Sequence, residues 1–403
     1  MTNAPCSSRR LNYQYFLMQM GFWAMFAAIC AYQTALLLGR GFSNGQVGLI
    51  LSMRCLSGII FQPALGGFAD RHPSLPIKRI VALSMSLSFC ANLALMQTRP
   101  GLAGTIVLFI IMGGFEISSY PLVDAMAIQY ISAGIPIRYS LGRGLGSLSY
   151  AACCILLGYL VKRFGVESAL VLHGILIVVE IVIVTAYPTF RAVSPAKYTP
   201  AGDPPHSIPA LLRYNRRFTL MLAAILLGMT GIIPVSNFLV NIIVDRGGTA
   251  SDLGLGLSLM TSSELVTAFF FPRLRCRLGS GRVVVLSLAF CGVKVLALLL
   301  SPCLAAVYLA QPLQMLGYGL FTPISVFYTN ESVPPADRVR GQTIMMVASN
   351  GMGGVLGNLL GGRAVDCFGV NGMLLCSLAC CMAGTALGLF SLRLRDGQIP
   401  VFE

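Results

Sequence analysis

Charged side chains are scarce in this chain of 403 residues. Asp, Glu, Lys and Arg together make up 10% of it, and only 14 residues are acidic. An ordinary soluble domain carries about 25% charged residues. A composition that is 56% hydrophobic, with a mean hydropathy of +0.78, exceeds what a water-soluble core of this length can bury. The composition therefore excludes a soluble globular protein and indicates an integral membrane protein.

Motifs typical of metal sites, nucleotide sites and catalytic sites are also missing. The 13 cysteines lie mostly inside apolar runs and show no CxxC or metal-ligand spacing, so we predict neither disulfides nor a metal site. There is no Walker loop, and GRGLGS at 142–147 does not follow a β-strand, so no nucleotide cofactor is expected. No paired histidines and acids, and no nucleophile with a base, are visible. We therefore predict that the protein is not an enzyme and needs no cofactor.

Long apolar runs dominate what is present. A bilayer core needs about 20 apolar residues per helix, and continuous runs favour helices over the weak alternation of a membrane β-barrel. The first run is too long for a cleaved signal peptide. We predict an all-α membrane protein with twelve spans, at roughly 13–37, 46–68, 78–98, 102–128, 142–161, 167–188, 218–244, 252–271, 282–301, 303–327, 340–364 and 370–392.

The chain is predicted to form two six-helix halves. The longest connection, residues 189–217, is rich in proline and basic residues and separates the predicted domains 1–188 and 218–403. LGYLVKRFGV at 157–166 aligns with GGRAVDCFGV at 361–370, an offset of 204 residues. Parallel repeats of this kind are expected to hold a solute site between them at the middle of the membrane.

The Lys and Arg residues predict the orientation. With the N-terminus inside, cytoplasmic segments carry 20 of the 28 Lys and Arg residues and the opposite loops carry 6. Both termini and the linker are therefore predicted to be cytoplasmic, in a multi-pass protein of the cell or inner membrane. The net charge of +14 is then a topology signal that also attracts anionic lipid, and no nucleic-acid partner is expected. A monomer is expected.

The loop after the second predicted span resembles the signature loop of the major facilitator superfamily. In GGFADRHPSLPIKR at 66–79, Gly66 is followed four residues later by Asp70, then by Arg71 and a basic pair. The resemblance implies a conformational switch at these three residues, in which the acid caps or pairs with a neighbour and the glycine permits close approach. A solvated loop is the alternative.

Nearly the whole chain resembles the lactose-permease-like branch of that superfamily, which includes oligosaccharide, nucleoside and phenylpropionate proton symporters. PLVDA, with Asp124, resembles the segment that carries a substrate-binding acid, and YSLGRGLGS, with Arg143, resembles the segment of its partner arginine. Tyr150 falls where lactose permease has a tryptophan that stacks on the sugar ring. SSELV places Glu264 on an eighth-span acid, and GVKVL places Lys294 on a ninth-span base.

The resemblance fails where lactose permease carries its proton network. Gln311, Gln314 and Gly317 stand in the tenth span in place of a Lys, a His and a coupling Glu. Asn350 replaces a Lys of the eleventh span, and Asn237 replaces an acid of the seventh. Neither lactose nor the coupling mechanism of lactose permease is therefore implied.

Each charge inside a predicted span costs about 2.5–3.5 kcal/mol on insertion scales, so each needs a role. Asp124 and Arg143 form part of the solute site, or else a structural ion pair or a pair of solvated helix ends. Arg54 has no local acid and is expected to contact an anionic solute, or to pair with an acid elsewhere. Glu264, close to Lys294, is the first choice for the proton carrier, and a buried pair that orders the second half is the alternative.

Three further polar residues share faces by spacing. Glu116 lies eight residues before Asp124, about two helical turns, and is expected on the same face. His173 and Glu180 lie seven residues apart and also share a face. A histidine near an acid can relay protons near neutral pH, but a structural histidine is the favoured interpretation here.

Aromatic and glycine residues have simpler expected roles. The aromatic side chains of the first span are expected to face lipid or the membrane interface: Tyr13, Tyr15, Phe22, Trp23 and Tyr32. Tyr32 and Gln33 also lie near enough to its outer end to reach a cavity. Three glycines recur every four residues in the eleventh span and predict a helix-packing stripe: Gly353, Gly357 and Gly361.

These patterns together predict a secondary transporter that works by alternating access. The expected cargo is a small polar solute, such as a sugar, a nucleoside or an aromatic acid, with coupling to protons. The predicted solute contacts are Asp124, Arg143, Tyr150, Arg54 and Asn237, and the predicted coupling residues are Glu264 and Lys294. A drug or metabolite efflux carrier and an uncoupled facilitator are the alternatives within transport.

Overall fold

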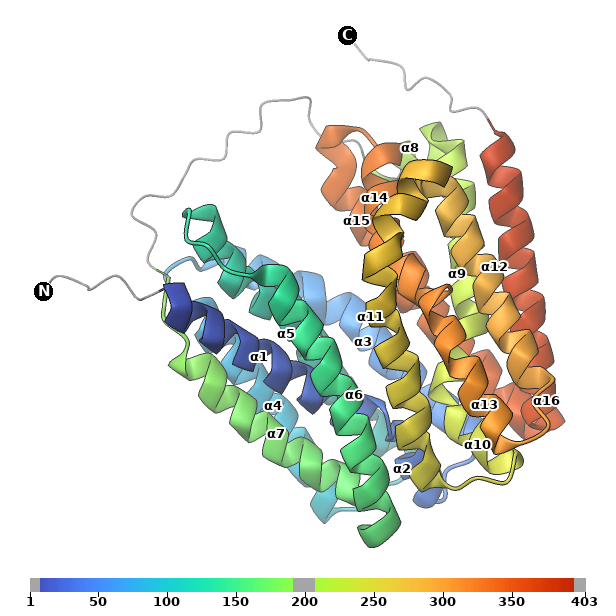
Figure 1. The fold of residues 1–403 in the computed structure, drawn as a ribbon. Helices are drawn as coiled ribbons and strands as arrows, with labels where there is room; N and C mark the ends of the chain where they lie inside the picture. The colour runs from blue at the N-terminus through green and yellow to red at the C-terminus, as the bar shows by residue number, and fades with distance from the viewer. Residues whose placement is uncertain (1–7, 191–206, 395–403) are drawn as a thin grey trace, which may run out of the picture. The chain divides into compact units, whose positions relative to one another are not determined.

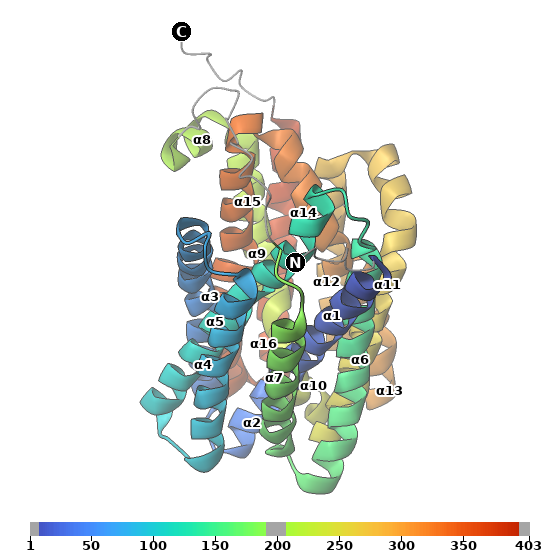
Figure 2. The same ribbon diagram turned by 90° about the vertical axis from the view of Figure 1, so that its left-hand side faces the viewer.

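The computed structural model describes residues 8–190 and 207–394, which form helices joined by turns and contain no strand. Contacts divide the chain into two compact units, Met1–Pro195 with Thr249–Ser262 and Ala196–Gly248 with Ser263–Glu403. Figures 1 and 2 show the helices of each unit from two directions. Most of the predicted linker and both predicted cytoplasmic termini lie outside the described residues.

The first unit is built on a bundle whose core lies along α1, α4, α5 and α7. α1 packs against α6 and α7, while α5 packs against α3 and α4. The helices are α1 (Ser8–Cys30), α2 (Gln33–Gly39), α3 (Asn44–Arg71), α4 (Ile77–Gln97), α5 (Leu102–Ser132), α6 (Tyr139–Phe164) and α7 (Ser168–Ala186).

Local contacts set several helix ends in this unit. α3 begins with a capping box, in which Ser43 Oγ accepts from the Gln46 backbone at 3.3 Å and Gln46 Oε1 accepts from the Ser43 backbone at 3.0 Å. Lys78 Nζ donates to the backbone oxygens of Thr185 and Tyr187 at 3.0 and 2.8 Å. A cation at the carbonyl end of a helix is favourable, so this contact fixes the start of α4 to the end of α7.

In the second unit, α16 packs against α9 and α12, and α12 also packs against α14. The helices from residue 207 onward are α8 (Ile208–Tyr214), α9 (Arg216–Asn237), α10 (Leu239–Asp245), α11 (Leu253–Leu278), α12 (Ser280–Leu299), α13 (Leu304–Ala310), α14 (Tyr318–Ser332), α15 (Arg338–Met346) and α16 (Gly353–Arg393). α11 begins in the segment that belongs to the first unit and continues into the second.

The segment Thr249–Ser262 groups with the first unit because of close backbone approach to α6. A Cβ added at Gly158 would meet the Ser251 carbonyl oxygen at 2.7 Å, and one added at Gly254 would meet the Gly158 backbone nitrogen at 3.0 Å. Small residues permit such approach between membrane helices. The predicted second domain, 218–403, includes this segment, whereas contacts group it with the first unit.

Ten helical stretches in the described ranges are long and apolar enough to cross a membrane. The last, Pro335–Arg393, includes Gly369 with φ of +70°, where two helices meet within α16. The predicted span 303–327 is broken by a 3₁₀ turn at Gln311–Met315, which separates α13 from α14. The fold is thus an all-helical membrane fold, and the count of twelve spans stays a prediction.

Three other predicted spans are also interrupted. The span 13–37 breaks between α1 and α2, and the span 218–244 breaks at Phe238 between α9 and α10. The span 340–364 contains a π-helical turn at Val347–Met352. Apolar periodicity does not reveal such breaks, because long apolar runs continue beyond each break and the few polar residues beside them, such as Gln33 and Asn237, resemble those inside unbroken helices.

The predicted glycine stripe is confirmed as a packing surface. A Cβ added at Gly353 would meet Met229 Cβ at 2.7 Å, and one added at Gly357 would meet Pro234 Cδ at 2.9 Å. Gly361 also lies directly against Pro234. The absence of side chains at these positions therefore sets the distance between α9 and α16.

The expectation that the aromatic side chains of the first span face lipid holds for Tyr13, which is exposed. It is wrong for Tyr15, Phe22 and Tyr32, which are buried. The physical reason is that α1 is covered by both α6 and α7, so most of its surface meets protein.

The predicted switch residues lie at the end of α3. Asp70 and Arg71 are exposed and form no hydrogen bond or ion pair within the described part of the chain. A Cβ added at Gly66 would meet nothing within 4 Å, so the expected close approach is not present in this conformation. The switch therefore stays a prediction for another conformation.

Candidate functional site

Asp124 of α5 and Arg143 of α6 face each other in the first unit. Arg143 Nη1 lies 3.7 Å from Asp124 Oδ2, which is an ion pair longer than a hydrogen bond. Gln19 of α1 supplies the hydrogen bond that Arg143 does not, because its Nε2 donates to Asp124 Oδ1 at 2.8 Å. Three helices thus meet at one carboxylate.

Arg143 has hydrogen-bonding capacity to spare. Its Nη1 is buried and has no hydrogen-bond partner among the described residues. Its side chain is 30% exposed, whereas that of Asp124 is 12% exposed. A guanidinium offers five N–H donors in a planar fork. Arg143 can therefore donate to an incoming solute while it stays close to Asp124.

Aromatic rings surround the guanidinium of Arg143. It lies 5.2 Å from the ring centroid of Trp23 and 4.8 Å from that of Tyr120, which are cation–π distances. Trp23 in turn lies edge-on to Tyr120 and Tyr150, with centroids 5.5 and 6.5 Å away. Gly146 allows this arrangement, since a Cβ there would collide with the Trp23 ring.

We call Asp124, Arg143, Gln19, Trp23 and Tyr120 the arginine–aspartate site. The sequence predicted the first two, and the structure brings them together. It did not predict Gln19 and Trp23, whose side chains meet one turn apart on α1, where Trp23 Nε1 donates to Gln19 Oε1 at 3.3 Å. Their spacing of four residues, with the only tryptophan of the chain, is a signal that could have suggested a shared face.

Arg54 lies in a separate buried cluster of the first unit. Its Nη2 is 3.1 Å from Glu116 Oε2, and their side chains are 7% and 0% exposed. Its Nη1 donates to Cys30 Sγ at 2.9 Å and to Gln33 Oε1 at 3.3 Å. In this structure Arg54 is paired with an acid on another helix, which was the alternative to a solute contact.

The cluster around Glu116 also includes His173 of α7. His173 Nε2 lies 3.2 Å from Glu116 Oε1, and both side chains are fully buried. Ser88 of α4 donates to the same oxygen at 2.6 Å. Although Glu116 and Asp124 share α5, they belong to different polar clusters.

In the second unit, Gln314 bridges Glu264 and Lys294. Lys294 Nζ donates to Gln314 Oε1 at 2.7 Å, and Gln314 Nε2 donates to Glu264 Oε1 at 3.1 Å. Lys294 is 2% exposed. The sequence predicted that Glu264 and Lys294 are close, and the structure links them through the glutamine that replaces a lactose-permease coupling position.

The other predicted residues of the second unit form helix-to-helix contacts. Asn237 Nδ2 donates to Asn358 Oδ1 at 2.7 Å, which links α9 to α16. Tyr318 donates its hydroxyl proton to Asn350 Oδ1 at 2.9 Å. As a solute contact, Asn237 stays a prediction.

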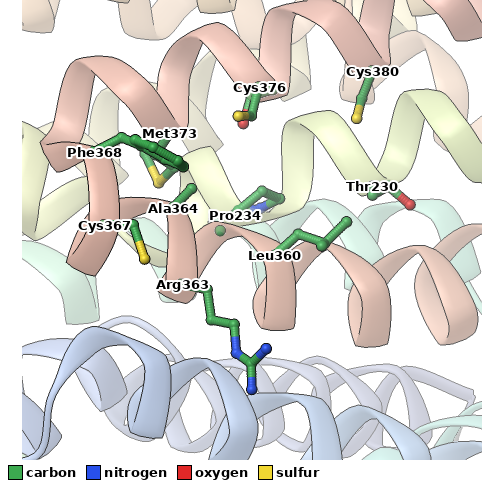
Figure 3. Close-up of a pocket in the computed structure, with 12 residues that line it drawn as sticks. Thr230, Pro234, Leu360, Arg363, Ala364, Cys367, Phe368, Met373, Cys376 and Cys380 are labelled. Atoms are coloured by element: carbon green, nitrogen blue, oxygen red, sulfur yellow. The ribbon is translucent and has the colours of Figure 1, made fainter.

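A cavity of about 280 Å³ in the second unit lies between α9 and α16. Figure 3 shows its lining, which includes Thr230, Pro234, Phe368 and the thiols of Cys367 and Cys376. It contains none of the predicted site residues. Since its walls are almost entirely apolar, it offers too few polar groups to select a polar solute.

No group of three or more His, Cys, Asp or Glu side chains that could hold a metal ion occurs in residues 8–190 and 207–394. The polar clusters of both units contain guanidinium, amide, carboxylate and ammonium groups, and that around Glu116 also contains an imidazole, a hydroxyl and a thiol. Such groups can donate to and accept from a polar solute, and the carboxylates can also bind protons.

Comparison with known proteins adds family evidence. The model of the family described as "MFS_1 like family" matches residues 9–374. A maltose permease of Geobacillus stearothermophilus is 23% identical over 376 residues, which cover 92% of this chain and 91% of the permease.

Solved structures with a similar fold include two kinds of transporter. The nucleoside transporter NupG matches with a TM-score of 0.79 at 14% identity, over 96% of this chain and 100% of that one. An auto-inhibited peptide transporter of the POT family matches with a TM-score of 0.74 at 14% identity, over 97% and 99%. At these identities the likeness shows the fold alone.

Proposed function

We propose, from the premise that this chain belongs to the MFS_1 like family of membrane transporters, that it is a secondary transporter of a small polar solute. The solute binds at the arginine–aspartate site and crosses the membrane by alternating access. Twelve spans in two six-helix bundles, with cytoplasmic termini, are the architecture on which this proposal rests. A sugar is the first choice of solute.

The observation that carries the proposal is the incomplete pairing of Arg143. Asp124 accepts a hydrogen bond from Gln19, and Arg143 Nη1 has no hydrogen-bond partner among the described residues. A hydroxyl group both donates and accepts, so a pair of neighbouring hydroxyls suits one side chain that accepts and one that donates. The faces of Trp23 and Tyr120 beside them suit the apolar face of a sugar ring.

The chemistry ranks the solute classes. A sugar matches the acceptor, the donor and the aromatic faces, and the maltose permease relative supports it. A nucleoside supplies ribose hydroxyls and a stacking base, so it is the second choice. An aromatic acid is less suitable, because its carboxylate would be repelled by Asp124 as it approached Arg143.

Proton coupling is assigned to Glu264 of the second unit. Glu264 accepts a hydrogen bond from Gln314, and Gln314 accepts one from the buried Lys294. These two contacts support an electrostatic interaction between the carboxyl group of Glu264 and the ammonium group of Lys294. Glu264 binds the proton, and Gln314 relays the change of charge to Lys294 through its amide dipole. An uncoupled facilitator and an efflux carrier are the alternatives.

A thermal-shift measurement on the purified protein tests the solute site, since a ligand that binds the native state stabilises it. We expect maltose to raise the unfolding temperature of the wild type and to lose this effect in Arg143→Ala. Arg163 lies on the same helix, is exposed, and in the described part of the chain donates to Tyr159 and lies over the ring of Phe164, so Arg163→Ala should respond to maltose as the wild type does. Uridine and 3-phenylpropionate test the other solute classes.

Two outcomes would contradict the site. In one, none of the three solutes stabilises the wild type. In the other, Arg143→Ala responds as strongly as Arg163→Ala. Addition of the stabilising solute to energised cells then tests coupling, because symport makes the medium more alkaline. Uptake without a pH change, and insensitive to an uncoupler, would favour the facilitator.

A further inference from the structure

Gln19 of α1 belongs to the arginine–aspartate site but is buried where a solute does not reach it. It is 1% exposed, whereas the side chain of Arg143 is 30% exposed. Gln19 contacts two members of the site, since its Nε2 donates to Asp124 Oδ1 at 2.8 Å and its Oε1 accepts from Trp23 Nε1 at 3.3 Å. It can therefore act on a solute only through these neighbours.

The two neighbours determine how the Gln19 amide is oriented. The indole nitrogen of Trp23 is a donor only, so it must face the amide oxygen. The amide nitrogen then faces Asp124, and the hydrogen bond at Oδ1 has only one possible direction. The Trp23 ring is itself held in place by Gly146 of α6, where a Cβ would collide with the ring. The amide of Gln19 is thus fixed at both ends.

The hydrogen bond from Gln19 sets how the carboxyl group of Asp124 is turned. The terminal torsion of an aspartate is broad, so the carboxyl group turns at little cost unless a neighbour holds it. The hydroxyl groups of Tyr120 and Tyr139 also interact with this carboxyl group. Because a hydroxyl proton can rotate to follow an acceptor, these contacts leave the direction open. The fixed amide of Gln19 does not follow, and it therefore sets the direction.

The ion pair between Asp124 and Arg143 is open in this orientation. Arg143 Nη1 lies 3.7 Å from Asp124 Oδ2 and has no hydrogen-bond partner among the described residues. An arginine and a carboxylate that pair freely often form two parallel hydrogen bonds, with lengths of about 2.7–2.9 Å. The two side chains are therefore close enough to pair fully and yet do not.

We infer that Gln19 is a positioning residue that keeps the Asp124–Arg143 pair open. Its hydrogen bond holds one carboxylate oxygen toward α1, so Arg143 retains a donor. Without this bond, the carboxyl group turns toward Arg143 and forms the two parallel hydrogen bonds. That a solute uses the open pair rests on the proposed function, whereas the opening of the pair by Gln19 does not.

A closed pair lowers the apparent affinity for a solute that needs the free donor. The Kd is raised by the inverse of the fraction of the protein that is in the binding-competent form. If about 90% of the pairs are closed in a variant without the Gln19 amide, the Kd rises roughly 10-fold. The loss arises from the state of the pair, since Gln19 itself does not touch the solute.

Gln19→Met removes the amide and keeps an unbranched side chain of similar length. A crystal structure of this full-length variant without solute should show Arg143 Nη1 within about 3 Å of Asp124 Oδ2. The wild type, crystallised in the same way, should keep the pair open. A pair that is equally open in both, or already closed in the wild type, would overturn the inference. Gln19→Leu removes the amide with a differently shaped side chain and should close the pair as well.

Gln14→Met is the matched control on the same helix. Gln14 donates to the Ala186 carbonyl oxygen at 3.4 Å, so this variant should keep the pair open. Isothermal titration with maltose should then give a Kd that is roughly 10-fold higher in Gln19→Met and unchanged in Gln14→Met.

The two readouts separate this inference from the proposed function. A closed pair with an unchanged Kd would show that Gln19 does not position the site for the solute. If maltose did not bind the wild type, the proposed sugar site would be contradicted, and the distance between Arg143 and Asp124 in Gln19→Met would still decide whether Gln19 keeps the pair open.

Discussion

Arg54 and Arg143 are two arginines of the same unit that differ in burial and in the hydrogen bonds they donate. Arg54 donates to Glu116, Cys30 and Gln33 and is almost fully buried. Among the described residues, Nε of Arg54 and Nη1 of Arg143 each lack a hydrogen-bond partner, and Arg143 Nη1 lies 3.7 Å from Asp124 Oδ2. The clearer difference is access, because Arg54 is 6% exposed whereas the side chain of Arg143 is 30% exposed, so Arg143 is the more accessible donor for a ligand.

The first prediction concerns the fork of Arg143. Arg143→Lys keeps the charge and removes the planar fork, so we expect the Kd for the solute to rise roughly 10-fold. Arg143→Ala removes the hydrogen bonds to a charged group, worth about 1.5–3 kcal/mol, and should raise the Kd by roughly 10- to 100-fold or more. Isothermal titration calorimetry on the detergent-solubilised protein measures both. Equal Kd values for the wild type and Arg143→Ala would contradict the assignment.

Trp23 provides the second prediction. Its ring lies beside Arg143, Tyr120 and Tyr150, so Trp23→Leu should weaken solute binding by about 0.5–1.5 kcal/mol, the worth of an aromatic contact. Trp23→Tyr should restore part of the affinity. Tyr13→Leu is the matched control, because Tyr13 is an exposed aromatic residue on the same helix. A loss of affinity of the same size in Tyr13→Leu would indicate a general effect on α1.

The sequence predicted the charged members of the site but not the neutral ones. Asp124 and Arg143 stand out because charges are rare in apolar runs and need a role. Gln19 and Trp23 do not stand out in a span that contains several other polar and aromatic residues. Their role depends on which face of α1 meets α5 and α6, and that face is set by tertiary packing.

Helix α16 contacts α9 along a line of glycines that ends at Pro234. Gly357 and Gly361 both lie against this proline. The ring of Pro234 projects from α9 toward α16, so the residues of α16 that face it must be small. Gly357 and Gly361 therefore form a groove on α16 that holds the ring of Pro234.

The third prediction concerns this groove. Gly361→Val adds a branched side chain against Pro234, and overpacking of this kind costs typically about 1–3 kcal/mol. We expect a lower unfolding temperature in a thermal-shift measurement. Gly67→Val is the matched control, because a Cβ at Gly67 would meet nothing within 4 Å. If both variants were equally stable, the groove would not set the helix spacing.

The sequence predicted where the membrane-spanning segments lie, but it did not predict the breaks inside them. Runs of apolar residues define where a helix can lie in a membrane, and ten such helices are present among the described residues. Polar residues do occur at the breaks, such as Asn237 before Phe238, Gln311 and Gln314 in the 3₁₀ turn and Asn350 in the π-helical turn, but polar residues also occur inside unbroken helices, as Gln62 does in α3 and Asn92 in α4. The breaks arise where the backbone bends to fit neighbouring helices, and periodicity does not report that.

The two compact units carry different polar machinery. The first contains the arginine–aspartate site and the Glu116 cluster, whereas the second contains the Glu264–Gln314–Lys294 chain. The linker and the internal similarity predicted two halves. The start of α11 groups with the first unit because of a glycine contact with α6, which sequence order does not reveal.

The fourth prediction concerns coupling. Glu264→Gln keeps a hydrogen bond with Gln314 but can no longer bind a proton. We expect this variant to lose accumulation of solute against a gradient and to retain exchange of solute across the membrane. Uptake into energised membrane vesicles, with and without an imposed pH gradient, measures the difference.

Glu331→Gln is the control for this experiment. Glu331 is an exposed acid of the same unit that pairs with Arg275 at 2.8 Å, so its loss should leave accumulation unchanged. Accumulation that persists in Glu264→Gln would remove Glu264 from the coupling mechanism.

Counterflow in proteoliposomes provides the strongest test that a solute binds at the arginine–aspartate site and is carried across the membrane. Vesicles loaded with unlabelled maltose are diluted into medium with a trace of labelled maltose, and no proton gradient is imposed. The wild type and Arg163→Ala are predicted to accumulate label transiently, whereas Arg143→Ala should not. Equal accumulation in both arginine variants would contradict the proposed site.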